Sequence, residues 1–148
     1  MKSRWWLPAV AVLVPLVVAG CGTSKEKPGS SKAAYIDQVD VVCQEVIPKA
    51  KSMSAQDQAT AQQQAALWQD AYNRIRAFPM PGESVEQARQ FLTSLDNLDM
   101  SYTAAANAFT AGFPDRATRA FADAKTTKEN AAKVAGEYGY SQCAFIAG

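Results

Sequence analysis

From residue 32 onward the apolar residues recur every three or four positions, and this spacing limits the possible folds more than any other feature of the chain. No stretch alternates apolar and polar residues for long enough to predict a β-strand. The helical segments are joined by short connections, which favour antiparallel neighbours. We therefore expect an all-α fold: an antiparallel, up-down four-helix bundle closed by a C-terminal tail.

The first two helices are expected to lie on either side of a break near residue 54. Ser30 or Ser31 can cap the first helix, and Pro48 is expected to kink or end it near Ile47. Residues 54–57 resemble a capping box that starts the second helix. The residues expected to face the core are Tyr35, Ile36, Val39, Val42, Cys43, Val46, Ala50 and Met53 in the first helix and Ala61, Ala65, Trp68, Tyr72 and Ile75 in the second.

The second helix carries a polar, glutamine-rich outer face that includes Gln62 and Gln63, and residues 78–82, with two prolines and a glycine, should end it. The third helix is expected over about residues 84–111. Gly112 should stop that helix and Pro114 should start the fourth. The expected core stripes are Phe91, Leu95, Leu98, Tyr102, Ala105 and Phe109 in the third helix and Ala117, Phe121, Ala124, Ala131, Ala135 and Tyr138 in the fourth.

Two polar residues depart from these apolar stripes. Lys128 lies within the alanine-rich stripe of the fourth helix, and Asp99 borders the stripe of the third. One interpretation is a partly buried ion pair between them. The interpretation we favour is that Asp99 is solvated and that Lys128 lays its aliphatic stem on apolar surface with its ammonium in water.

Charge and residue usage argue against nucleic-acid binding and against most catalytic sites. The 148 residues include 15 basic and 14 acidic side chains, with no basic block, and no histidine at all. Histidine is the commonest general base near neutral pH and the commonest transition-metal ligand. There is no glycine-rich phosphate loop, and carboxylate pairs such as Glu83 with Glu86 or Asp96 with Asp99 are common on solvated helix faces. We expect no enzymatic activity, no cofactor and no metal site.

The first twenty residues have the anatomy of a secretory signal. Lys2 and Arg4 precede an uncharged run over residues 5–20 that ends in small residues. This run holds two prolines, Pro8 and Pro15, and is shorter than the ~20 residues of a membrane-spanning helix. The segment is therefore expected to be removed as a signal peptide, residues 1–20.

The signal ends in Val18-Ala19-Gly20-Cys21, which resembles the lipobox of bacterial prolipoproteins. The resemblance implies that Cys21 receives a diacylglyceryl group, that cleavage occurs before Cys21, and that fatty acyl chains such as palmitate anchor the mature protein to the cell membrane on its extracytoplasmic side. The alternatives are an ordinary secretory signal with an accidental cysteine and an uncleaved anchor. Residues 22–31 contain no large apolar side chain, so residues 21–31 are expected to form a flexible tether to a helical domain over residues 32–148.

The mature chain is also similar to small, alanine-rich helical lipoproteins of actinobacteria, on two short motifs. These are Val41-Val42-Cys43-Gln44 in the first helix and the closing segment Tyr138-Gly139-Tyr140-Ser141-Gln142-Cys143. The resemblance implies fold and envelope location. Proteins of this kind mostly have no assigned biochemical role, so the resemblance transfers no active site.

The cysteine count predicts one disulfide bond. If lipidation consumes Cys21, only Cys43 and Cys143 remain, in a chain exported to a compartment where disulfides persist. The tail after the fourth helix must then run beside the first helix for about 17 Å, which about five extended residues can just span. The alternative is two separate free thiols that behave as small buried apolar groups.

Two functional hypotheses follow from this organisation. The first is a membrane-anchored cell-envelope lipoprotein that acts as a non-enzymatic helical adaptor or scaffold for an envelope protein partner. The alternative is a carrier or binding module that holds a lipid or another apolar ligand between the helices, where alanine stripes face bulky side chains such as Trp68 and Phe91.

Lipidation of Cys21 can be tested by intact-mass analysis of the protein purified from membranes. We expect a diacylglyceryl-modified chain that starts at Cys21, because the lipobox directs both reactions to this residue. Cys21→Ala should leave unprocessed precursor or release the protein from the membrane. A normally processed and localised protein with an unmodified Cys21 thiol would contradict the hypothesis.

Overall fold

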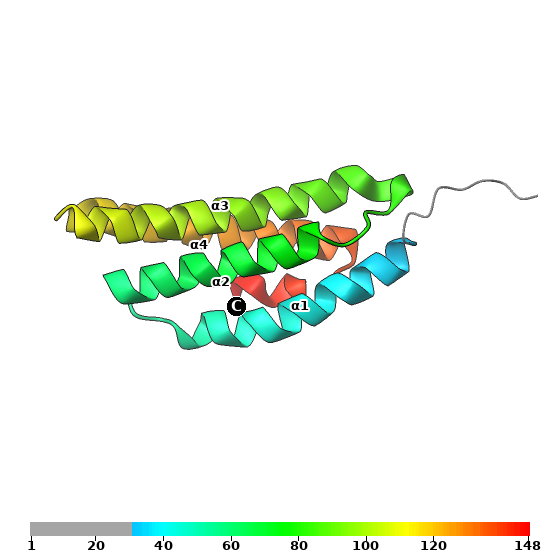
Figure 1. Ribbon diagram of the computed structural model, residues 1–148, viewed down its shortest axis with the longest axis horizontal. Helices are drawn as coiled ribbons and strands as arrows, with labels where there is room; N and C mark the ends of the chain where they lie inside the picture. The colour runs from blue at the N-terminus through cyan, green and yellow to red at the C-terminus, as the bar shows by residue number, and fades with distance from the viewer. Residues whose placement is uncertain (1–30) are drawn as a thin grey trace, which may run out of the picture.

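The computed structural model describes residues 31–148, which form four α-helices and no strand. The helices are α1 (Lys32–Ser52), α2 (Gln58–Arg76), α3 (Val85–Thr110) and α4 (Pro114–Tyr138). Two short 3₁₀ segments accompany them: η1 (Gly82–Ser84) precedes α3, and η2 (Cys143–Ala147) lies in the C-terminal tail. Consecutive helices run in alternating directions (Figure 1). The predicted all-α fold of four packed helices is confirmed.

The C-terminal tail takes part in the bundle as a packing element. The segment η2 packs against both α4 and α1, and lies between them (Figure 1). Helix α3 packs along α2 and α4, whereas α1 packs mainly against α2 and the tail. The tail therefore fills the side of the bundle on which α1 and α4 would otherwise face each other across a gap.

The prediction that Pro48 kinks or ends the first helix near Ile47 was wrong about the end. Helix α1 continues to Ser52, with Pro48 inside it. Pro48 is exposed, so the Gln44 carbonyl that loses its usual amide donor lies on the solvent side of the helix. Ile47 and Ala50, on the inner side, are buried. Their packing offsets the cost of the proline, and the helix continues.

The N-terminal caps agree with the sequence in α1 but not in α2. The Ser31 hydroxyl accepts a hydrogen bond from the Ala34 amide, as predicted. In α2 the capping residue is Asp57, whose carboxylate accepts from the Thr60 amide at 2.7 Å, so Ser54 is not the cap. A carboxylate three residues before a free amide is a strong N-cap by itself and needs no capping box.

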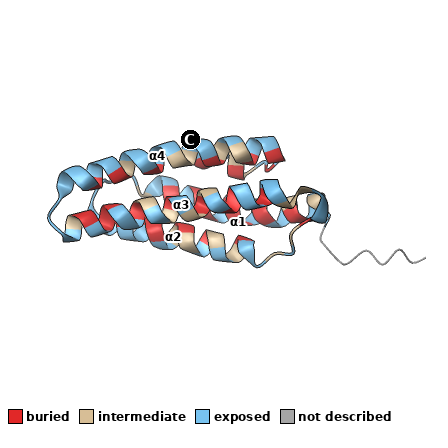
Figure 2. Cartoon of the chain, turned by 90° about the horizontal axis from the view of Figure 1, so that it is seen from above, coloured by how far each residue is buried: buried red, intermediate tan, exposed pale blue. Residues whose placement is uncertain are grey.

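The two termini of the α3–α4 connection were predicted correctly. Gly112 has a φ of 75°, a left-handed conformation suited to glycine, and Pro114 occupies the first turn of α4. Along both helices the predicted stripes form the buried face (Figure 2). The bulky exceptions are Phe109 and Phe121, which are only partly buried.

One buried polar residue interrupts the apolar core, and the sequence patterns did not reveal it. Gln64 in α2 is 2% exposed. Its amide nitrogen donates to the carbonyls of Ala50 and Met53, at 2.8 and 3.1 Å. Its amide oxygen accepts from the indole nitrogen of Trp68 at 2.9 Å. Gln64 therefore binds two carbonyls at the C-terminal end of α1, of which that of Ala50 also accepts from the Met53 amide, and connects that end to α2.

Replacement of Gln64 should be far more damaging than replacement of its neighbour. Gln64→Ala leaves the buried Trp68 N–H without its partner and removes one hydrogen bond each from the Ala50 and Met53 carbonyls, so we expect the free energy of unfolding to fall by about 2 to 4 kcal/mol. Gln63→Ala, an exposed change in the same helix, should cost under about 0.5 kcal/mol. Denaturant unfolding of both variants measures the difference. Equal losses would mean that the phase of α2 is wrong.

Candidate functional site

The predicted disulfide is formed in the structure. The sulfurs of Cys43 and Cys143 are bonded at 2.03 Å, with 5.1 Å between the Cα atoms. Cys43 lies on the buried face of α1, and Cys143 opens η2. The predicted lipidation site, Cys21, lies outside the described residues. The bridge makes the Cys43–Cys143 pair a structural element of the domain.

The C-terminal tail leaves α4 beside the first turn of α1. The ring of Tyr138, the last residue of α4, lies 6.5 Å from the ring of Tyr35 and 4.6 Å from the Lys32 ammonium. From this turn the tail runs along α1 to Cys43 for about 12 to 17 Å, within the span expected from the sequence. Gly139, with a φ of 104°, turns the chain back toward α1.

Asp40 holds the tail in place, a role that the sequence did not reveal. Its carboxylate accepts hydrogen bonds from the Ser141 amide and hydroxyl, at 2.9 and 2.7 Å. It also accepts from the amides of Gln142 at 2.9 Å and Cys143 at 3.4 Å. These are the free amides at the start of η2, so Asp40 caps η2 from a different helix.

Three tyrosines pack at the end of the molecule where α1 begins and α4 ends. The ring of Tyr140 lies 6.4 Å from that of Tyr35 and 4.6 Å from that of Tyr138. The Tyr138 hydroxyl is within 2.9 Å of the Ser84 hydroxyl, while the hydroxyls of Tyr35 and Tyr140 have no well-formed hydrogen bond among the described residues. Burial raises the pKa of both Tyr35 and Tyr140.

The structure decides against an ion pair between Asp99 and Lys128, since no salt bridge among the described residues joins them. Asp99 accepts a hydrogen bond from the Thr103 hydroxyl at 3.3 Å, and partial burial raises the pKa of its carboxyl, with a smaller contribution from nearby Asp96. The described residues contain no group of three or more His, Cys, Asp or Glu side chains that could hold a metal ion.

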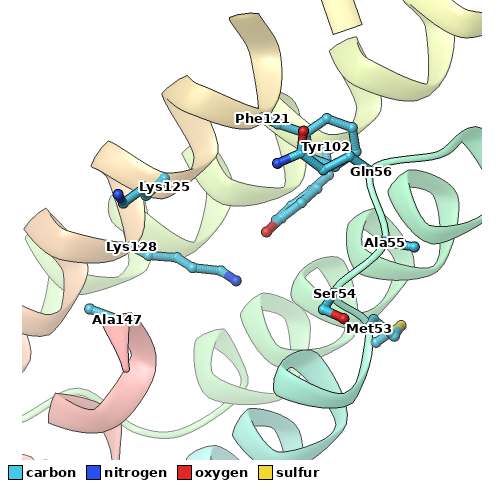
Figure 3. Close-up of a pocket in the computed structure, with 9 residues that line it drawn as sticks. All are labelled: Met53, Ser54, Ala55, Gln56, Tyr102, Phe121, Lys125, Lys128 and Ala147. Atoms are coloured by element: carbon cyan, nitrogen blue, oxygen red, sulfur yellow. The ribbon is translucent and has the colours of Figure 1, made fainter. Parts of the chain in front are cut away.

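Lys128 projects into a cleft between α4 and the connection from α1 to α2 (Figure 3). Its ammonium lies 5.5 Å from the centre of the Tyr102 ring and 5.9 Å from that of Trp68. Two adjoining hollows share this side chain, with volumes of about 220 and 400 Å³. The walls of the first hollow include Met53 and Phe121. None of the described residues that line either hollow carries a carboxylate side chain.

A second candidate surface lies at the far end of the α3–α4 hairpin. We define the tip surface as the residues around a groove of about 500 Å³: Ala104, Asn107, Ala108, Ala111, Phe113, Arg116, Arg119, Ala120 and Asp123. Phe113 is 49% exposed, and the Arg116 guanidinium stacks 4.6 Å from its ring centre. Met100, one turn before Ala104 on α3, is 61% exposed and extends the apolar strip. Four alanines line the groove, together with two arginines and one acidic residue, Asp123.

Comparison with known proteins adds no family to these observations. No family model matches the chain, and no curated protein or solved structure is significantly similar to it. Within residues 31–148, no helix combines the length and hydropathy that a membrane span requires.

The buried tyrosines predict a loss of stability in alkaline solution. Both pKa values are raised above the ordinary value of 10.0, so above that pH the unfolded chain releases protons that the folded protein retains. The free energy of unfolding should therefore fall as pH rises above about 10, by at most about 1.4 kcal/mol per pH unit for each tyrosine. The Tyr35→Phe/Tyr140→Phe variant should show a shallower decline in pH-dependent urea unfolding. A decline as steep as that of the wild type would contradict this assignment.

Proposed function

We propose that this protein is a lipid-anchored adaptor of the bacterial cell envelope, attached through Cys21, which uses the tip surface to bind a partner protein. The observation that supports this best is the apolar groove with the exposed Phe113 ring, located at the opposite end of the bundle from Lys32 (Figure 1). The sequence has no histidine and no catalytic motif that we recognised, which agrees with a role in binding.

The direction of the helices supports the tip surface as the part presented to a partner. The proposed tether leads into α1 at Lys32, close to where α4 ends. Helix α3, of 26 residues, and α4, of 25, run from that end for about 37 to 39 Å. Their connection extends beyond both α1 and α2 (Figure 1). A membrane anchor at Cys21 would therefore leave the tip surface free to meet a partner in the envelope.

The chemistry of the tip surface fits an amphipathic helix of the partner. The alanines that line the groove allow a helix backbone to approach closely. Phe113 offers a large aromatic ring of the kind enriched at interface centres. Arg116 and Arg119 can each pair with a carboxylate through two N–H groups. We therefore propose a partner helix with apolar anchors and flanking Asp or Glu residues.

Site-specific photocrosslinking in intact cells tests the adaptor function. A photoreactive amino acid at position 113 of the full chain should capture one defined envelope protein. The same amino acid at position 63, exposed on α2, should not capture it. A second probe carries the photoreactive amino acid at position 107, where Asn107 also lines the groove. Adding Phe113→Ala to this probe should reduce capture by about tenfold or more, since interface aromatics often contribute more than about 1.4 kcal/mol.

A charge-reversed pair of variants separates binding from folding. Arg119→Glu should abolish capture without lowering the melting temperature, while Arg89→Glu, an exposed arginine on α3 away from the tip, should leave capture intact. Capture of only a second copy of the same chain would replace the adaptor by a self-associating protein. Equal capture at positions 63 and 113 would contradict the assignment of the tip surface.

A further inference from the structure

The Lys128 ammonium has no anionic partner within residues 31–148 and lies in a partly enclosed place. Lys128 is partly buried, and no ion pair among the described residues joins its nitrogen to a carboxylate. Its partners are the faces of Trp68 and Tyr102, at the outer limit of about 6 Å for a cation–π contact. The ammonium therefore has N–H donors to offer to another group.

The groups around Lys128 have the character of a small anion site with an apolar wall. The Tyr102 hydroxyl points into the cleft near the ammonium (Figure 3). Ser54, from the connection between α1 and α2, adds a second hydroxyl to the lining, and Lys125 lies one turn away on α4. Met53 and Phe121 supply apolar surface beside these donors. The two hollows are lined by three lysines, Lys51, Lys125 and Lys128, and by no acidic side chain, while the main-chain carboxyl group of Gly148 borders the larger hollow. The excess of positive charge favours a negative ligand in the smaller hollow.

We propose that this cleft binds a small amphiphile that carries a carboxylate or a phosphate on an apolar stem. The anionic group contacts the nitrogen of Lys128 and the hydroxyl of Tyr102, and the stem packs on Met53 and Trp68, which line the larger hollow. The hollow of about 220 Å³ accommodates the anionic group, and the adjoining hollow of about 400 Å³ accommodates several methylene groups. This inference does not rest on the adaptor function.

The site is at the surface, not between the helices where the sequence placed an apolar ligand. It also lies at the C-terminal end of α1, whose 21 residues separate it from Lys32 by about 30 Å. If residue 32 is held near a bilayer, an amphiphile that has left the membrane reaches the cleft more readily than the headgroup of a lipid that is still in the bilayer. The anionic chemistry is shared by both sources, and the experiment distinguishes them.

Calorimetric titration of octanoate into the full chain, held in phosphatidylcholine nanodiscs, tests the proposal. We expect saturable binding of octanoate, and binding at least about tenfold weaker for octanol, which has the stem without the charge, and for acetate, which has the charge without the stem. Titration of empty nanodiscs corrects for partition of octanoate into the lipid. Octanol as tight as octanoate would overturn the role of the cation, and acetate as tight as octanoate would overturn the role of the apolar wall.

Three lysine variants assign the binding to the cleft. Lys128→Met keeps an unbranched stem and removes the ammonium, so octanoate should bind at least about tenfold more weakly. Lys128→Arg keeps the charge and should retain binding. Lys133→Met changes an exposed lysine of α4, which forms an ion pair with Glu137 at 3.9 Å, and should have no effect. Wild-type affinity in a folded Lys128→Met protein would overturn the proposal, with folding checked by its melting temperature.

Nanodiscs that contain phosphatidylglycerol identify the source of the ligand. If octanoate binds equally well in these nanodiscs, the ligand is a free amphiphile. If binding weakens in the wild type but does not change in Lys128→Met, a lipid headgroup competes for the same cation. Both results support the anion site. If phosphatidylglycerol weakens octanoate binding by the same factor in the wild type and in Lys128→Met, the membrane itself causes the loss, and this result counts against the site.

Discussion

The fold depends on the attachment of the C-terminal tail to α1. Helix α1 has its main helical neighbour in α2, and the tail supplies most of the rest of its packing surface, with Tyr138 of α4 at its first turn. The Cys43–Cys143 bond and the four hydrogen bonds to Asp40 hold that surface in place. The bond closes a loop of about 100 residues, for which the chain-entropy model gives up to about 4.7 kcal/mol relative to the unfolded chain. This contribution is large beside the roughly 5 to 15 kcal/mol of a typical domain.

The same attachment makes the two ends of the bundle physically different. At the end where α1 begins, the tail inserts Tyr140 against Tyr35, Phe91 and Tyr138, so large rings fill the core. At the other end a small separate core, shared by the hairpin and the start of α2, consists of four buried alanines, namely Ala61, Ala105, Ala106 and Ala120, with Phe121 packed against them. Alanines bury little apolar area each and so stabilise their surroundings less. The tip is therefore expected to open more easily than the aromatic end, a property that suits a surface that adapts to a partner.

Sequence patterns predicted the helices, the core stripes and the disulfide because each of these depends on local spacing or on simple counting. The helical period located Trp68, Leu95 and Ala135 in the core. The sequence patterns did not predict contacts between residues that are distant in sequence, nor the effect of tertiary packing on a helix end. Asp40 resembles any solvated acid on a helix until the tail is placed beside it, and Pro48 resembles a helix end until its inner neighbours are seen to be buried.

The candidate surfaces were still harder to predict. Lys128 was recognised as out of place in an alanine stripe, but the cleft depends on the position of the connection between α1 and α2, which no periodicity determines. The tip surface likewise depends on how far α3 and α4 extend beyond the other two helices. The exposed ring of Phe113 follows Gly112, in a segment that the sequence patterns marked only as a helix stop and start.

Gln64 and Lys128 show how two polar residues at core-facing positions can have opposite roles. Gln64 satisfies its amide with two carbonyls and one indole N–H as partners, so it acts as part of the scaffold. Lys128 lies close to the same Trp68 ring, yet the partners of its ammonium in the described part of the chain are two aromatic faces, at 5.5 and 5.9 Å. Burial of an ammonium with incomplete compensation costs free energy that a well-packed apolar side chain would avoid. The anion that we propose for the cleft would recover part of that cost, so Lys128, unlike Gln64, is a polar residue with hydrogen-bond donors left for a ligand.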